Sequence, residues 1–181
     1  MSRCGAVTAS GLVGLVALTL TGCGPSPADA ENAALHNLAS SVAAMRQVTT
    51  GLAELSPSAS AAAHSVMHDG TVASYLAKPL NSSDNLPAPT FVGAWNASVK
   101  GDQFSFDAVL TGQGDAGGGD QSYQTSLFVC VHTTATWHSG GKAQVSNAPC
   151  RTDITAVLTT RGSKHTTLNA VQRSTRAADP F

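Results

Sequence analysis

The chain has 181 residues, a length that suits one ordinary domain. Its 10 basic and 11 acidic residues give a net charge of −1, so no basic excess exists to neutralise a phosphate backbone, and we expect no nucleic-acid partner. Charged residues make up only 12% and aromatic residues 5% of the chain, which predicts a core of small side chains and argues against a large aromatic-lined pocket.

The first residues have the pattern of an export signal. Arg3 precedes an apolar run from Gly5 to Thr21, which is short for a membrane-spanning helix but fits the apolar region of a signal peptide. The run ends in Leu20-Thr21-Gly22-Cys23, which resembles the lipobox of bacterial lipoproteins: an aliphatic residue, a small or β-branched residue, Gly or Ala, then Cys. This resemblance covers no other part of the chain. It implies that residues 1–22 are removed and that the Cys23 sulfur receives a diacylglyceryl group.

Lipidation at Cys23 would place the protein outside the cytoplasm, on the surface of the cell membrane. Each buried lipid methylene contributes about 0.8 kcal/mol, so two acyl chains form a firm anchor. Residues 23–29 would serve as the lipidated tether, and the rest of the sequence has no second apolar run long enough to span a bilayer. The alternative is an ordinary signal peptide in which Cys23 is incidental.

The remaining cysteines predict one disulfide. Cys4 lies in the segment to be removed, which leaves Cys130 and Cys150 as an even pair in an exported protein. The chain has no C-x-x-C motif, and two thiols twenty residues apart lack zinc spacing, so we favour a structural bond over a redox or metal role. We expect no cofactor.

The first half of the mature chain has helical periodicity. Asp29 is a suitable N-cap for a helix from Ala30, whose apolar residues recur in steps of three and four: Leu35, Leu38, Val42, Met45 and Leu52, with Val48 and Leu55 alongside. Such a stripe packs on a sheet or pairs with another helix. We favour the sheet, because the stripe is short and lacks flanking charge pairs.

A second helix is predicted after Ser56-Pro57, with Ser56 as its N-cap. It covers Ser58–His68, breaks at Asp69-Gly70 and resumes over 71–78, so that the helical half occupies 30–78. Residues 79–89 are rich in Pro, Asn and Ser and form a linker to the strands.

The second half, 90–173, alternates with a period of two. Strands 91–99 and 103–111 flank Gly101-Asp102, and a two-residue turn there places Val99 opposite Phe104 and Trp95 opposite Ala108, with all apolar pairs on one face. The glycine-rich segment 112–120 is predicted to be a loop.

A long strand, 123–137, follows the glycine-rich segment and turns at 139–141. This turn pairs His138 with Lys142 and brings Cys130 opposite Cys150, which supports the disulfide. A last hairpin joins strands 152–160 and 165–173, and residues 174–181 form a flexible tail. The predicted fold class is therefore α+β: two N-terminal helices packed on a curved antiparallel sheet of about five strands. This order of elements resembles the cystatin and NTF2-like folds, an architectural analogy that carries little functional weight.

Two groups of residues resemble metal sites. His64 and His68 lie four apart on a predicted helix, and both could face one metal ion, but the sequence has no H-E-x-x-H motif, so surface histidines are the preferred interpretation. Asp115 and Asp120 could bind calcium, but EF-hand spacing is missing and a solvated loop is preferred.

Other residues resemble parts of catalytic sites. Ser139 and Lys142 match S-x-x-K, yet the glycines between them predict a hairpin tip instead of the helix start that this motif needs. Asp107 and Asp153 fall on predicted strands, where an inward carboxylate could act as a base, but the period directs Asp107 to water. Trp95 and Trp137 are expected to pack in the core, with an exposed partner anchor as the alternative.

The sequence therefore favours a membrane-anchored extracytoplasmic lipoprotein with a non-catalytic binding or accessory role in the cell envelope. Its expected partners are the membrane, through Cys23, and an envelope protein. A small-molecule binder with a cavity between helices and sheet is the first alternative. An NTF2-like enzyme is the second. The oligomeric state stays open.

Overall fold

A computed structural model describes residues 24–68, 90–118 and 121–178. The predicted signal peptide and Cys23, the continuation of the second helix beyond Asp69, the linker 79–89 and Asp120 lie outside these ranges.

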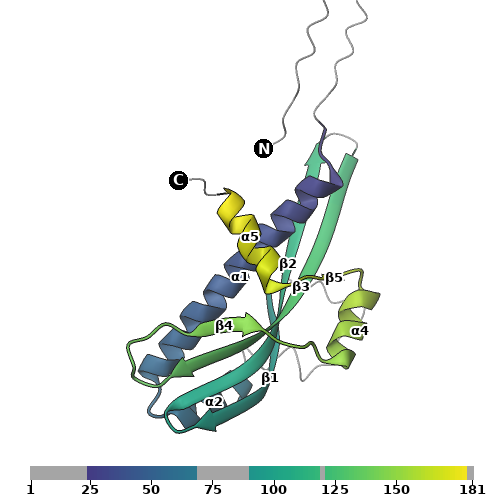
Figure 1. The fold of residues 1–181 in the computed structure, drawn as a ribbon. Coiled ribbons are helices and arrows are strands. Elements are labelled where there is room, and N and C mark those ends of the chain that lie inside the picture. Colours follow the sequence, from purple (N-terminus) through teal and green to yellow (C-terminus); the bar gives the residue numbers. More distant parts are fainter. Residues whose placement is uncertain (1–23, 69–89, 119–120, 179–181) are drawn as a thin grey trace, which may run out of the picture.

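The fold class is α+β, as predicted, with N-terminal helices packed on a five-stranded sheet within the described residues. Helices α1 and α2 precede four antiparallel strands in the order β1-β2-β3-β4 (Figure 1). A two-residue strand, β5, pairs with β3 in parallel, and α4 and α5 complete the chain. The bounds are α1 Pro27–Leu55, α2 Ala59–His68, β1 Thr90–Lys100, β2 Gln103–Gly118, β3 Gln121–Thr136, β4 Gln144–Asn147, α4 Thr152–Thr160, β5 Lys164–His165 and α5 Leu168–Ala178.

Helix α1 begins at Pro27, earlier than the predicted start at Ala30. Ser26 is its N-cap and forms a capping box with Asp29: the Ser26 backbone N–H and hydroxyl donate to the Asp29 carboxylate at 3.0 and 2.7 Å, and the Asp29 N–H donates to the Ser26 hydroxyl at 3.3 Å. The hydrogen bond from the Ser26 hydroxyl is the main cause that holds the pKa of Asp29 below 3.8. Only residues 24–26 therefore separate Cys23 from a rigid helix.

The end of α1 also differs from the prediction. Ser56 is the C-cap of α1, with its N–H bonded to the Leu52 carbonyl, and does not cap the next helix. Ser58 takes that role for α2, because its hydroxyl accepts from the Ala61 N–H at 3.1 Å.

The glycine-rich segment that predicted a loop continues strand β2 to Gly118. Its glycines lie where α1 crosses the strand: a Cβ on Gly112 would sit 2.5 Å from the Ala34 carbonyl oxygen, and one on Gly114 would overlap the backbone of Ala30 and Ala34. These residues are glycines because the helix backbone rests directly on the strand. Figure 1 shows α1 running along β2 and β3.

The last two predicted strands, 152–160 and 165–173, are wrong, because helices α4 and α5 occupy most of these residues. In α4, Ile154 and Leu158 bury one face against Trp95 and Phe128, a spacing of four that fits a helix. In α5, Leu168 and Val171 pack into the core with α1, and the helix extends to Ala178, inside the predicted tail. The β-branched content of α4 favours a strand locally, and tertiary packing overrides it, whereas the α5 segment is poor in β-branched residues.

The two faces of the sheet bury two separate cores. The larger core lies between the sheet and helices α1, α2 and α5, and its largest side chains include Phe104, Phe106, Leu38 and Leu110. The smaller one lies under α4 on the opposite face and contains Trp95, Phe128, Cys130 and Leu158. Beside α4, no helix or strand that the structure describes covers the part of this second face that carries His132.

Cys130 and Cys150 form the predicted disulfide, with a Cα–Cα distance of 5.3 Å. The predicted register is wrong, however, because Val131 pairs with Asn147, and Cys150 lies beyond the end of β4. The turn before β4 is longer than three residues because the end of α1 holds it: the His138 N–H donates to the Ala53 carbonyl at 3.1 Å.

Candidate functional site

A β-bulge in β1 shapes the uncovered face of the sheet. Val99 pairs with Phe104 as predicted, but the register shifts between Trp95 and Ser98, and Trp95 pairs with Asp107 instead of Ala108. Asn96 lies in the shift with φ of 54°, a left-handed conformation that non-glycine residues rarely adopt. The extra residue turns Trp95 to the α4 side, where it is 5% exposed, so its predicted place on the Phe104 face is wrong.

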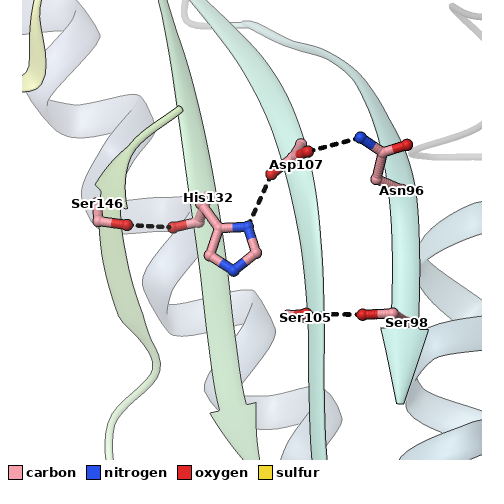
Figure 2. A network of polar contacts seen from close by, with 6 residues as sticks. All are labelled: Asn96, Ser98, Ser105, Asp107, His132 and Ser146. Carbon is pink, nitrogen blue, oxygen red and sulfur yellow. Dashed lines mark hydrogen bonds and ion pairs between the residues drawn. The ribbon is translucent and has the colours of Figure 1, made fainter. Parts of the chain in front are cut away.

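The same bulge positions Asn96 beside Asp107. The Asn96 side-chain amide donates to Asp107 Oδ2 at 2.8 Å, while His132 Nδ1 lies 2.7 Å from Asp107 Oδ1 (Figure 2). Both carboxylate oxygens are therefore held from opposite sides. The Asp107 side chain is 16% exposed and that of His132 is 41% exposed. In the tautomer with its proton on Nδ1, the His132 ring donates to the Asp107 carboxylate and keeps Nε2 as a hydrogen-bond acceptor.

Serine hydroxyls extend this network over four strands. Ser98 and Ser105 hydrogen-bond to each other at 3.0 Å, and the Ser146 hydroxyl donates to the His132 carbonyl at 3.4 Å. Figure 2 shows these side chains on β1 to β4 around the Asp107–His132 pair. We call this surface the polar face; its residues are Asn96, Ser98, Ser105, Asp107, His132 and Ser146.

Asp153, a candidate base in the sequence, lies in the first turn of α4 and not on a strand. Arg151 donates to both of its carboxylate oxygens, at 3.0 and 2.6 Å, and the Arg151 guanidinium also lies 6.0 Å from the centre of the Trp95 ring. The hydrogen bond from Arg151 is the main cause that lowers the pKa of Asp153 below 3.8. An exposed carboxylate held in its ionised form by a cation is a poor general base at neutral pH.

The other candidates do not converge on one site. His64 is exposed on α2, and the side chain of His68 lies outside the part of the chain that the structure describes. No group of three or more His, Cys, Asp or Glu side chains suited to a metal ion occurs in the part of the chain that the structure describes. Asp115 accepts from the Gln124 side chain at 2.9 Å across the β2–β3 hairpin.

Ser139 lies at the hairpin tip, as predicted, and its hydroxyl donates to the Thr136 carbonyl and accepts from the Gly141 N–H. The segment Ser139–Lys142 therefore lacks the helical turn that the S-x-x-K motif needs.

Trp137 is half-buried and structural. Its ring N–H donates to the Ser56 carbonyl at 2.8 Å, and its ring stacks on His138 with centroids 4.3 Å apart. It fastens the end of β3 to the end of α1. Sequence reasoning missed His132, although a β2–β3 hairpin that pairs Gly118 with Gln121 places this histidine directly opposite Asp107.

A scan against protein-family models, a search of curated proteins and a search of solved structures each gave no match. Among the helices of the described ranges, none is both long and apolar enough to cross a membrane.

Proposed function

We propose that this chain is a lipid-anchored extracytoplasmic protein with a non-catalytic binding or accessory role in the cell envelope, and that it presents the polar face to a protein partner. The observation that carries the proposal is the Asp107–His132 pair, which Asn96 holds in place on an uncovered part of the sheet. Rigid strands fix these donors and acceptors before any partner arrives, which reduces the entropy lost on binding.

Two features support the location and the anchor. The Cys130–Cys150 disulfide is typical of proteins that fold outside the cytoplasm. The lipobox at Leu20–Cys23 supports lipidation, and residues 24–26 span at most about 10 Å when extended. An anchored domain would therefore stay close to the bilayer surface.

The hydrogen bonds of the polar face support binding over catalysis. Nucleophilic catalysis needs a hydroxyl or thiol within reach of its base. On this face Ser98 and Ser105 bond to each other, and Ser146 bonds to a backbone carbonyl. A cavity between α1 and β2 is also disfavoured where Gly112 and Gly114 meet the helix, since not even a Cβ fits there.

Fractionation of the Cys23→Ala variant tests the anchor. We expect the wild-type protein in the membrane fraction, the variant in the soluble fraction, and an intact mass for the wild type that includes the lipid and starts at Cys23. Unchanged membrane association of the variant would contradict the anchor.

Site-specific photo-crosslinking in intact cells tests the polar face. A crosslinker at exposed Ser146 is compared with one at Glu31, an exposed residue of α1 away from this face. We expect a discrete protein adduct only from Ser146, and we expect Asp107→Ala to abolish it because His132 loses its orienting partner. Equal adducts from the two positions would refute a role for the polar face.

A further inference from the structure

The outer flank of α1 carries an exposed apolar strip in its second half. Val48 is 56% and Leu55 87% exposed, and Ala44 is exposed as well. Together with Gly51 these residues are spaced four, three and four apart, so they share one helix face. We call them the α1 strip: Ala44, Val48, Gly51 and Leu55. The strip lies on the opposite side of the helix from Val42 and Ala53, which are buried in the core.

Gly51 gives the strip its second, independent feature. Glycine is disfavoured inside a helix, and at Gly112 and Gly114 close contact with the chain itself explains its presence. At Gly51 no such contact occurs among the residues that the structure describes, since an added Cβ would meet none of their atoms within 4 Å outside the backbone of its own helix turn. The fold of one copy therefore does not require this glycine. Its missing side chain leaves room for another backbone to approach the helix from outside.

We propose that the α1 strip pairs with the same strip of a second copy anchored in the same membrane. This inference rests on the proposed lipid anchor at Cys23. Two copies anchored in one leaflet have the first turns of α1 at the same level, because only residues 24–26 separate each helix from its lipid. A two-fold axis along the membrane normal then brings identical residues together, as a closed symmetric dimer requires.

Geometry and charge favour a second copy of the chain over the bilayer as the partner of the α1 strip. Val48 lies 21 residues after Pro27, about 32 Å along the helix axis, which places the strip beyond the reach of the bilayer when α1 stands upright. All four residues are uncharged, so the strip meets no like charge in a second copy. A single helix flank is smaller than the interfaces of stable soluble dimers, so we expect pairing to depend on the local concentration that the anchor provides.

Disulfide trapping of the lipidated full chain on vesicles of phosphatidylcholine and phosphatidylglycerol tests the proposal. Cys130 and Cys150 are bonded to each other and Cys23 carries lipid, so Val48→Cys introduces one free thiol. The matched control is Ala43→Cys, which is also exposed but lies about 140° around the helix from Val48. Under mild oxidation we expect at least about tenfold more crosslinked dimer from Val48→Cys, because only that position lies in the contact. Equal yields would overturn the proposal.

A second substitution separates pairing from random collision. Gly51→Arg, added to Val48→Cys, should reduce the dimer yield to that of the control, because the arginine side chain would block the approach of a second helix. Within one copy, no described residue obstructs a side chain at this position. An unchanged circular dichroism spectrum shows that the fold is intact. An undiminished dimer yield in this double variant would refute the strip as the interface.

Failure of the anchor can be told apart from failure of the strip. With Cys23→Ala, we expect dimer from Val48→Cys to fall by about a hundredfold or more at equal bulk concentration. If Cys23 instead proves to be a free thiol in the wild type, the anchor is wrong. The strip is then judged in concentrated soluble protein by the same comparison of Val48→Cys with Ala43→Cys, both in the Cys23→Ala background so that each variant keeps one free thiol.

Discussion

Replacement of Gly112 by alanine should push α1 away from β2. The new Cβ would lie 2.5 Å from the Ala34 carbonyl oxygen and 2.7 Å from the Leu38 backbone nitrogen, and ordinary contact begins at 3.4 Å. Both obstructing atoms belong to the helix backbone, so no side-chain rotation relieves the overlap. Overpacking costs about 1–3 kcal/mol, and we expect the upper end for Gly112→Ala, and at least as much for Gly114→Ala.

Gly117→Ala is the matched control on the same strand. Its Cβ would meet the Gln121 carbonyl at 3.4 Å, an ordinary contact, so we expect unchanged stability or a gain of about 0.5–1 kcal/mol from the lower entropy of the unfolded chain. The free energy of unfolding is measured in urea by tryptophan fluorescence, with all variants in the soluble Cys23→Ala background. The Gly112→Ala/Gly114→Ala double variant should lose less than the sum of the single losses, because one displacement relieves both overlaps. If Gly112→Ala is as stable as Gly117→Ala, the argument for close helix–strand contact fails.

Three further predictions concern other parts of the fold. Replacing Cys130 and Cys150 together by serine should lower the free energy of unfolding by about 3 kcal/mol, because the bond joins residues separated by 20 positions; a loss below about 1 kcal/mol in urea unfolding would contradict this. Asp29 has a lowered pKa, so its ionised form stabilises the protein above pH 3.8 and this contribution is lost as the pH falls through the lowered pKa. Asp29→Asn should therefore lose less stability than the wild type between about pH 4 and 2 in acid-unfolding curves, and parallel curves would count against it. Asn96→Val should cost about 1–3 kcal/mol, since a β-branched residue is strained at φ of 54°, whereas Asn96→Gly should cost clearly less; equal thermal or urea stability of the two would disprove the strain.

The local parts of the fold could be predicted from the sequence. The stripe of α1 and the Gly101-Asp102 turn depend on neighbouring residues, so periodicity and turn chemistry suffice to find them. Helix α4 could not be found in this way, because its β-branched residues favour a strand until Ile154 and Leu158 are packed against the sheet. In α5 the buried Leu168 and Val171 lie three apart, a helical spacing that a period of two does not describe. The glycine-rich part of β2 has the composition of a loop. Its glycines are explained only by the close contact of α1 with this strand, which the sequence does not reveal.

The candidate site depends on a bulge that sequence patterns do not reveal. A regular ladder from the turn at Gly101-Asp102 places Trp95 on the face of Phe104, and one extra residue at Asn96 reverses its side. The period of the strand is enough to place Asp107 on the face opposite Phe104. Its partner His132 lies 25 residues further along the chain, on β3. The pairing of these two residues follows only when β2 is recognised as extending to Gly118, because that length fixes the β2–β3 register.

The Cys130–Cys150 disulfide determines whether the fragments separate after proteolysis. Every peptide bond between residues 130 and 150 lies inside the covalent ring that it closes, including those of the exposed turn at Ser139–Lys142. A protease that nicks this turn would leave a two-chain molecule of unchanged size, with α4 and α5 still attached to β3. Only a reductant would release the carboxyl-terminal fragment, so the nick shows on a denaturing gel with thiol and stays hidden without it.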